Sequence, residues 1–443
     1  MDKRRDSATD LLGFSAREVS SMNLCKKCVT PSNARPIIHF DGEGVCSGCR
    51  YRESYNQVDW AGRRSKLARV LSEYSARQRA KGNPYDCIVP ISGGKDSHYQ
   101  AHVIKNEFGL NPLYVAANHI FNTQIGHKNL RNLVNRIGGD LVRFTINPEA
   151  VGRIARWSLL EMGDITFHYH ASIMTLPMMM AVKYDIPLVV WGEEGFSQLT
   201  GMFQLGDDVE YTRWKTLQHD QRGYDREDLI GRGGGGMGKI RESDVEFMRY
   251  PSMEDVERVG VRGIYLGNYL PWDGLSQAKL MHERYDFGLK HRRARTFLAY
   301  AKTDDAANDI HSFLGYLKFD YSRGTTDSSE EIRAGRMPRE IGLLLAKYLD
   351  PQHPPEWEWY MRWLGLETEQ VLTALGRLAD GGENAVRERW SMSKQVPTRP
   401  FDGIGRGPLV EVLDFLEKGE PYYTCYAGAG WVSWKDNAIW EVL

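Results

Sequence analysis

The sequence of 443 residues lacks an excess of charge of either sign. Its 57 Lys and Arg residues are matched by 58 Asp and Glu residues, so the net charge is −1 at pH 7. Proteins that are drawn to nucleic acid or to anionic lipid by their overall field carry a clear positive balance. The composition therefore argues against nucleic acid as a partner, although a local basic patch would escape this argument.

Long apolar runs are lacking as well. The longest mostly apolar stretch, residues 171–182, contains Pro177 and is shorter than the roughly 20 residues that a membrane-spanning helix needs. Residues 1–6 are mostly charged and lead into no apolar segment like that of a secretory signal. We therefore expect a cytoplasmic protein that does not insert into membranes.

Cysteine is scarce, with six residues in the chain, but four of them are clustered. Cys25 and Cys28 form one Cys-x2-Cys pair, and Cys46 and Cys49 form a second pair after 17 intervening residues. Two such pairs can place four thiolates at the corners of a tetrahedron, and this spacing fits a structural zinc site. A redox-active or sulfur-carrying pair is the alternative interpretation. Zinc would stabilise a ribbon that has little apolar core of its own.

A glycine turn between two regular elements is the most informative stretch of the chain. Residues 85–89 are apolar and β-branched, as in a buried parallel strand, and residues 97–105 have helical composition. Adjacent glycines let the backbone approach an anion, and the first N–H groups of the following helix point at it. The turn consists of Ser92, Gly93, Gly94, Lys95, Asp96 and Ser97.

The charged residues of this turn distinguish it from other phosphate loops. Lys95 suits phosphate oxygens, but the Asp96 carboxylate would repel them unless a cation such as Mg²⁺ lay between. The order Ser-Gly-Gly-Lys-Asp-Ser is not a Walker A motif. It resembles the pyrophosphate loop of the N-type ATP pyrophosphatases, which cleave ATP between its α- and β-phosphates. The resemblance implies ATP as cofactor, Lys95 and Asp96 as catalytic residues, and Asp96 as a magnesium ligand.

The pattern after the loop predicts an α/β fold with a doubly wound parallel sheet. Strands are expected at 112–117, 141–146 and 186–191, and these alternate with helices expected at 124–137, 149–162 and 171–184. Ligands bind beyond the carboxyl ends of the strands in such sheets.

Three residues beyond these strand ends are therefore candidates for the site. We expect Asn118 and Gly192 to contact the cofactor and the Glu193 carboxylate to take part in catalysis, as a proton acceptor or a magnesium ligand. The alternative for Glu193 is a solvated acid in a surface connection. His168 and His170 could also face the pocket, although packing or surface roles are common for such residues.

Two later stretches need separate interpretation. Residues 233–239 fit the spacing of a phosphate loop, but Ile240 replaces the required hydroxyl and no apolar strand precedes them. We expect this glycine-rich insert, near 218–242, to be a hinge or a lid over the pocket. After about residue 351 the sequence predicts amphipathic helices at 356–364 and 367–378 and an irregular stretch at 390–408. We expect the aromatic residues to pack against the main domain, and stacking on a sugar or a nucleobase is the alternative.

Several motifs together resemble the N-acetyl sugar amidotransferase family over roughly residues 25–378. The cysteine pairs, the pyrophosphate loop, Trp191-Gly192-Glu193, and the segments 266–273 and 316–342 carry the resemblance. It implies an adenine nucleotide alpha hydrolase-like fold, with an N-terminal arm and zinc ribbon at 1–55, a pyrophosphatase domain at 56–348, and a mainly helical region at 349–443.

The resemblance also implies a reaction. The family is understood to convert the acetamido group of a nucleotide-linked N-acetyl sugar to an acetamidino group for surface polysaccharide or flagellar glycan, with ATP, Mg²⁺ and Zn²⁺ as cofactors. Neither Cys87 nor Cys425 has the context of a glutaminase nucleophile, and both are expected to be packed thiols. A separate glutaminase is therefore the expected ammonia source, and an ammonia-channelling, cyclase-like subunit is compatible with it.

Two other functions remain open. A tRNA-modifying enzyme with the same loop, of the lysidine or thiolation type, would also explain a zinc ribbon. It would favour a basic surface and, for thiolation, a reactive cysteine near the pocket. A non-catalytic nucleotide-binding scaffold is the other alternative, and the presence of Lys95 and Asp96 argues against it.

Overall fold

A five-stranded parallel sheet forms the centre of the fold. The computed structural model describes residues 23–118, 120–193, 195–289 and 295–395. The strand order is β3-β2-β1-β4-β5, and all neighbouring strands are parallel. The chain winds outward in both directions from β1, so a switch point lies between β1 and β4. The strands are β1 (Cys87–Pro90), β2 (Pro112–Ala117), β3 (Asp140–Phe144), β4 (Leu188–Trp191) and β5 (Arg262–Tyr265).

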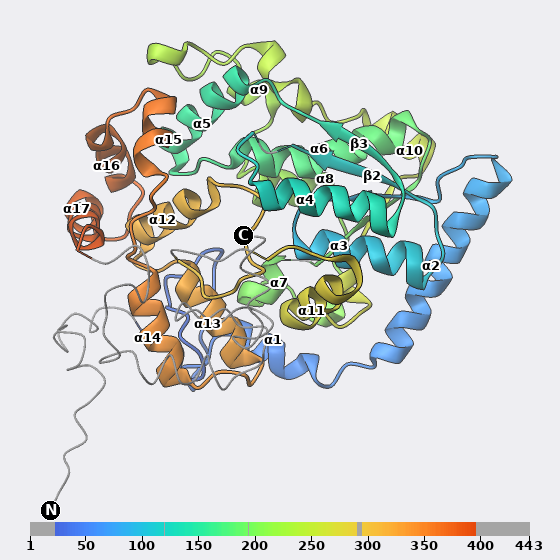
Figure 1. Cartoon of the computed structure of the whole chain (residues 1–443), viewed down its shortest axis with the longest axis horizontal. Helices are drawn as coiled ribbons and strands as arrows, with labels where there is room; N and C mark the ends of the chain where they lie inside the picture. The colour runs from blue at the N-terminus through green and yellow to red at the C-terminus, as the bar shows by residue number, and fades with distance from the viewer. Residues whose placement is uncertain (1–22, 119, 194, 290–294, 396–443) are drawn as a thin grey trace, which may run out of the picture.

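The central strands are apolar on both faces because helices cover both sides. Cys87 and Val89 of β1 belong to one buried cluster, whereas Ile88 between them belongs to the other. Helices α2, α3, α4 and α11 supply the first cluster, and α5 and α6 supply the second (Figure 1). This two-sided burial is the reason that the strands read as continuous apolar runs rather than as alternating patterns.

Seventeen α-helices lie within the described residues, and three of them continue into π-helical turns. The turns are Val103–Glu107 after α3, Leu133–Ile137 after α4 and Thr216–Asp220 after α8. The helices are α1 (Ser47–Tyr55), α2 (Trp60–Ala80), α3 (Lys95–His102), α4 (Gln124–Asn132), α5 (Pro148–Met162), α6 (Phe167–Lys183), α7 (Gly195–Thr200), α8 (Arg213–Lys215), α9 (Arg226–Leu229), α10 (Met253–Val259), α11 (Gly274–Tyr285), α12 (Asn308–Phe319), α13 (Arg323–Arg333), α14 (Arg339–Leu349), α15 (Trp357–Leu364), α16 (Thr368–Gly376) and α17 (Gly382–Ser393).

Local signals explain where several helices begin. Asn147 precedes α5, its side chain accepts a hydrogen bond from the backbone N–H of Glu149, and Pro148 occupies the first turn. Thr123 caps α4 in the same way through Gly126. An oxygen at this position satisfies one of the free N–H groups of the helix, and proline there loses no hydrogen bond.

The predicted doubly wound α/β sheet is confirmed, with one additional strand. The strands expected at 112–117, 141–146 and 186–191 and the helices expected between them are all present within a few residues. The strand β5, which has four residues, contains Gly263 and follows directly after α10, was not predicted. Helix α6 begins at Phe167, earlier than the expected residue 171, so His168 and His170 lie on it.

The C-terminal region is helical, as expected, and its aromatic residues are packed. Trp357 and Tyr360 of α15 are fully buried in a cluster with Phe313 of α12, and Phe121 lies against Trp363. The stretch from 390 was expected to be irregular, but residues 390–393 belong to α17. Cys425 and the rest of 396–443 lie outside the described residues.

The glycine-rich insert does not cover the pocket described below. Gly235–Met237 forms a short 3-10 turn beside α5, where the methyl group of Met237 lies close to Gly152 and Met237 packs with the C-terminal cluster. None of residues 231–239 lines the pocket. The insert therefore does not form the expected lid over the pocket, because apolar packing on α5 holds the turn elsewhere, and the expected hinge stays a prediction.

No helix in the described part of the chain is both long enough and apolar enough to span a bilayer. Helix α6 is apolar along much of its length, but several of its side chains are buried against the sheet in the second cluster.

Candidate active site

The predicted phosphate loop is a closed turn at the carboxyl end of β1. The backbone N–H of Ser92 donates to Ser97 Oγ at 2.7 Å, and the backbone N–H of Gly94 donates to Ser92 Oγ at 3.1 Å. A Cβ atom on Gly93 would lie 2.7 Å from the carbonyl oxygen of Gly126, so this position has no room for a side chain. Helix α3 begins at Lys95, two residues earlier than expected, and its first N–H groups lie at the loop.

This loop opens on a cavity of about 420 Å³. Ser92, Gly94, Lys95 and Asp96 line the cavity, whereas Gly93 and Ser97 shape the loop behind it. A volume of this size lies within the range of small-molecule sites. The remaining walls come from segments far away in sequence, which are described next.

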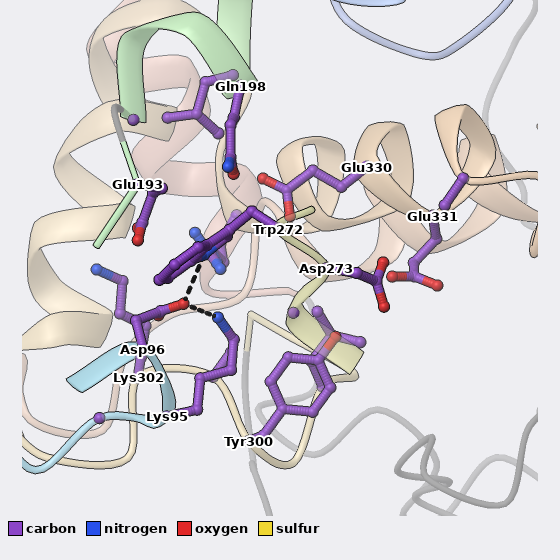
Figure 2. Close-up of a pocket in the computed structure, with 18 of the residues that line it drawn as sticks. Lys95, Asp96, Glu193, Gln198, Trp272, Asp273, Tyr300, Lys302, Glu330 and Glu331 are labelled. Atoms are coloured by element: carbon purple, nitrogen blue, oxygen red, sulfur yellow. Dashed lines mark hydrogen bonds and ion pairs between the residues drawn. The ribbon is translucent and has the colours of Figure 1, made fainter. Parts of the chain in front are cut away.

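Lys95 and Asp96 form an ion pair on one side of the pocket (Figure 2). Lys95 Nζ lies 2.6 Å from Asp96 Oδ1, and Trp272 Nε1 donates to the same oxygen at 3.1 Å. Burial opposes the charge of the Lys95 ammonium, but Asp96 and Glu193 outweigh it and raise the pKa of Lys95 above its usual value. Lys95 is therefore positively charged at neutral pH and suited to phosphate oxygens.

Glu193 enters the pocket from the end of β4, across the switch point from the loop. Burial, followed by repulsion from Asp96, raises the pKa of the Glu193 carboxyl to about 7. Glu330 of α13 adds to this repulsion, and Lys95 opposes it. A carboxyl group with a pKa near 7 can accept or release a proton at neutral pH.

The carboxylates of this wall fit a magnesium ion together with bound phosphate. Asp96 and Glu193 repel each other in the pocket, and a divalent cation relieves such repulsion. Mg²⁺ in nucleotide sites is held by one or two carboxylates, by phosphate oxygens and by water, so these two residues are sufficient on the protein side.

Helix α13 and the residues before it form the opposite wall. Tyr300, Arg323, Glu330 and Arg333 line the pocket, and Figure 2 shows Glu330 and Tyr300 around the cavity. Arg323 pairs with the fully buried Asp327 at 2.7 Å. The predicted segment 316–342 thus contributes side chains to the same cavity as the phosphate loop.

Another arginine closes this wall beside Trp272. Arg336 bridges two carboxylates, Glu331 at 2.6 Å and Asp273 at 2.8 Å. Asp273 follows Trp272 and caps α11. The network joins α11 to the end of α13.

The four clustered cysteines have the geometry of a zinc site. Cys25 Sγ lies 3.8 Å from Cys49 Sγ, and Cys28 Sγ lies 3.7 Å from Cys46 Sγ. In a tetrahedron with zinc–sulfur bonds of about 2.3 Å, neighbouring sulfurs lie about 3.8 Å apart. All four ligand atoms lie within 4.8 Å of one another and are buried. The cluster therefore fits a closed zinc site.

The ribbon around this cluster is also a wall of the pocket. Cys46 precedes α1 and Cys49 lies on it, and Tyr51, Arg52 and Tyr55 of the same helix line the cavity. The cysteine spacing predicted a stabilising role for the ribbon but not its position at the pocket.

Arg333 links the cluster to the pocket. Its guanidinium lies 3.5 Å from Cys46 Sγ, donates to Thr30 Oγ1 at 2.9 Å, and donates to the Leu199 carbonyl at 2.9 Å. Burial opposes its charge, but the neighbouring cysteine thiolates raise the pKa of Arg333. A cluster of four thiolates around Zn²⁺ carries a net charge of about −2, which Arg333 partly balances.

Two predicted contacts lie outside this pocket. Asn118 Oδ1 accepts from Asn122 Nδ2 at 2.8 Å, and Asn118 Nδ2 donates to Thr145 Oγ1 at 3.1 Å. The Gly192 carbonyl accepts from the backbone N–H of Gly267 at 3.0 Å, which joins the ends of β4 and β5. Neither residue is among the described residues that line the cavity, and their contact with ATP stays a prediction.

The two histidines of α6 also lie outside the pocket lining. His170 is enclosed with His311, and burial lowers the pKa of His170 to about 3, so it is neutral near pH 7. Tyr169 between them lines the cavity instead. Packing roles therefore explain the pair better than catalysis.

Comparison with known proteins shows that part of the chain toward its C-terminus matches a known family. Residues 286–392 match the family described as LPS biosynthesis protein WbpG-like, C-terminal domain. The match includes Tyr300 and the whole of α13, so it covers one wall of the pocket. The resemblance to amidotransferases of surface polysaccharide biosynthesis is consistent with this description.

Two further similarities are more limited. An uncharacterized protein of Methanocaldococcus jannaschii, MJ1599, is 27% identical over 118 residues, which is 27% of this chain and 41% of that protein. The structure of NMN synthetase from Francisella tularensis is 14% identical, covers 50% of this chain and 95% of its own, and has a TM-score of 0.24. The phosphate loop and the family of residues 286–392 together support a biosynthetic enzyme that uses a nucleotide.

Proposed function

We propose that the protein uses ATP to replace the acetamido oxygen of a nucleotide-linked N-acetyl sugar with nitrogen derived from ammonia. The products are an acetamidino sugar, AMP and pyrophosphate. One observation carries the proposal: the phosphate loop and the region that matches a lipopolysaccharide biosynthesis family line the same cavity. A pocket built in this way suits an ATP-dependent step in the synthesis of surface polysaccharide.

The residues of the pocket can be assigned to the steps of this reaction. The acetamido oxygen attacks the α-phosphorus of ATP, the bond to the β-phosphate bridging oxygen breaks, and pyrophosphate leaves with the electron pair. Lys95 and the N–H groups at the start of α3 stabilise the charge that develops on pyrophosphate. Mg²⁺ held by Asp96 would supply further neutralisation of phosphate charge.

In the second step ammonia attacks the imidate carbon, and AMP leaves with the former amide oxygen. The attacking nitrogen must lose a proton as the amidine forms. Glu193, with a pKa of about 7, is suited to accept it. Adenylation is needed because an amide is a poor electrophile with a poor leaving group.

The alternative of tRNA thiolation has less support in the pocket. None of the described residues that line the cavity is a cysteine. Cys87 lies fully buried in β1, and burial raises the pKa of its thiol, which makes a nucleophilic thiolate unfavourable.

A direct assay tests the proposal. Protein incubated with ATP, Mg²⁺, ammonium chloride and a panel of UDP-linked N-acetyl sugars should release AMP and pyrophosphate and produce a sugar nucleotide about 1 Da lighter, because NH replaces O. AMP formation should require the correct sugar. If no sugar in panels of UDP-, GDP-, CMP- and dTDP-linked compounds stimulates AMP release, the proposed function is wrong.

A further inference from the structure

The described pocket lining includes four arginines, and three of them already have partners. Arg323 pairs with Asp327, and Arg336 pairs with Glu331 and Asp273. The guanidinium of Arg333 is held by thiols, a threonine hydroxyl and backbone carbonyls. Each of these three arginines already has its charge balanced or its guanidinium held by the protein, so a phosphate gains less from binding there than at an arginine without an ion pair.

Arg52 is the exception. Within the described residues it forms no ion pair, and its guanidinium lies over the ring of Tyr55, 4.6 Å from the ring centroid. A ring on one face leaves the edge of the guanidinium, with its N–H donors, directed away from the stack. Such an edge suits an anion with paired oxygens, above all a phosphate.

Helix α1, which carries Arg52, is fixed at both ends. At its start, Cys46 and Cys49 belong to the zinc cluster, and Ser47 Oγ donates to the carbonyl of Thr200. A Cβ atom on Gly201 would lie 2.5 Å from the Ser47 carbonyl oxygen, so α7 approaches α1 closely there.

The other end of α1 is tied to the opposite wall. The hydroxyl of Tyr55 accepts a hydrogen bond from the backbone N–H of Trp272, whose indole contacts Asp96. Arg52 lies one turn after Cys49 and one turn before the end of the helix, between these two attachments. A long side chain on a fixed helix loses less entropy on binding than one on a mobile segment.

We propose that Arg52 binds the phosphate groups of the second substrate, and that the zinc ribbon serves to hold it there. The inference rests on the proposed function for the identity of that substrate, a nucleotide-linked sugar. Two polyanions that occupy one reaction site need separate positive groups. Lys95 and the start of α3 serve the ATP phosphates, and Arg52 serves the diphosphate of the sugar nucleotide.

Titration of the full chain with nucleoside diphosphates tests the proposal without turnover. The protein is saturated with Mg²⁺ and α,β-methylene ATP, which occupies the ATP site and cannot be cleaved. Calorimetry then measures the Kd of UDP, GDP and dTDP, with uridine, guanosine and thymidine as ligands that lack phosphate. The Arg52→Ala variant should bind the preferred diphosphate about 10- to 100-fold more weakly and bind its nucleoside as the wild type does.

Arg50→Ala is the matched control. Arg50 lies on the same helix, but it pairs with Asp41 and Glu53 and does not line the cavity. Its removal should leave the Kd of the diphosphate unchanged. Both variants should keep their zinc content and melting temperature, and Arg52→Lys, with a single charge and no planar fork, should regain part of the affinity.

Several results would overturn the proposal. The first is an unchanged Kd of the diphosphate in Arg52→Ala, and the second is an equal loss of affinity for it in Arg50→Ala. The others are a loss of affinity for α,β-methylene ATP, and not for the diphosphate, in Arg52→Ala, and the absence of diphosphate binding to the wild type. Because the titration requires no catalysis, its result is independent of whether amidine is formed. A protein that makes no amidine can still show the Arg52 effect, and an active protein can lack it.

Discussion

Trp272 donates a hydrogen bond through Nε1 to Oδ1 of Asp96 at 3.1 Å, and these residues are 176 positions apart in the sequence. The same carboxylate oxygen is 2.6 Å from Lys95 Nζ. Two donors on one oxygen restrict the orientation of the Asp96 side chain and leave Oδ2 for other ligands. Trp272 is therefore placed to orient the Asp96 carboxylate, for which we propose a catalytic role.

Replacement of Trp272 by phenylalanine tests this role. Trp272→Phe keeps most of the apolar contact area and removes the hydrogen bond to Asp96. A hydrogen bond to a charged group contributes about 1.5–3 kcal/mol, so we expect the rate of pyrophosphate release to fall by about 10-fold or more. Single-turnover measurement of pyrophosphate checks this.

Trp357→Phe is the corresponding control. Trp357 Nε1 donates to Thr368 Oγ1, also at 3.1 Å, within the C-terminal cluster and outside the pocket lining. Its replacement should lower the melting temperature without changing pyrophosphate release. Equal kinetic effects in the two variants would show that a loss of folding, and not the contact with Asp96, explains the change.

The phosphate loop itself leads to a stronger prediction. Asp96→Ala should abolish pyrophosphate release because the cation loses its protein ligand, and Lys95→Ala should reduce the rate by orders of magnitude because charge on the leaving pyrophosphate is no longer stabilised. Lys81→Ala, which removes a half-exposed ion pair with Asp185, should behave as the wild type. Turnover near the wild-type rate in either loop variant would contradict the catalytic assignment.

Glu193 predicts an unusual dependence of stability on pH. Its pKa is raised from 4.5 to about 7 in the folded protein, so ionisation opposes folding increasingly as the pH rises through this interval. Glu193→Gln cannot ionise. In buffer without Mg²⁺ it should therefore raise the melting temperature at pH 8, and the gain should shrink as the pH falls toward 4.5.

A control variant separates the effect of Glu193 from the ordinary titration of a surface carboxylate. Glu257→Gln, at an exposed position of α10, should change the melting temperature little at either pH. Addition of Mg²⁺ should stabilise the wild type more than Glu193→Gln at pH 8. A melting temperature of Glu193→Gln that runs parallel to the wild type at all pH values would contradict the raised pKa.

The sequence predicted features that depend on local patterns. The loop at Ser92–Ser97, the cysteine pairs and the alternation of strands and helices all follow from spacing, periodicity and turn residues within short windows. The strand β5 was missed because four residues that include Gly263 give too short a pattern. Position at a strand end also identified Glu193, because parallel strands place their carboxyl ends at one edge.

The rest of the site depends on contacts between distant segments. Glu330 on a charged helix resembles a solvated residue in the sequence, and only the fold brings it near Glu193. Arg333 reaches Thr30 across 303 positions, and Arg52 is indistinguishable from the neighbouring Arg50 until α1 is placed. Asn118 shows the limit of the strand-end argument, because a residue at a strand end can be engaged by its neighbours and not line the cavity, and its contact with ATP stays a prediction.

The zinc cluster predicts a metal-dependent fold of the ribbon. Purified protein should contain about one Zn²⁺ per chain by elemental analysis, and Cys46→Ser should lose the metal and lower the melting temperature. Since α1 begins at this cluster, the variant should also lose affinity for ligands of the pocket. Cys87→Ala removes a buried thiol outside the cluster and should keep its zinc. A wild-type protein that is stable without zinc would contradict this account.

The source of nitrogen gives the last prediction, and it begins from the chemistry of ammonia. Only the free base has the lone pair that attacks an adenylated amide, and most ammonia is ammonium near neutral pH. The described pocket lining contains no cysteine that could release ammonia from glutamine. We propose that a separate glutaminase supplies ammonia at high local concentration, which also limits hydrolysis of the intermediate.

The isolated chain should then use high concentrations of ammonium, with a rate that rises with pH as the free base increases, and glutamine alone should support no turnover. Addition of the cognate glutaminase should restore activity with glutamine at neutral pH, and its catalytic-cysteine variant should not. In a second series, total ammonium is adjusted at each pH so that the concentration of free ammonia stays constant. The rate should then still rise with pH only if a group on the enzyme, such as Glu193, also titrates. If the purified chain hydrolyses glutamine and forms amidine by itself, the two-component proposal is wrong, and a cysteine of this chain must be the nucleophile.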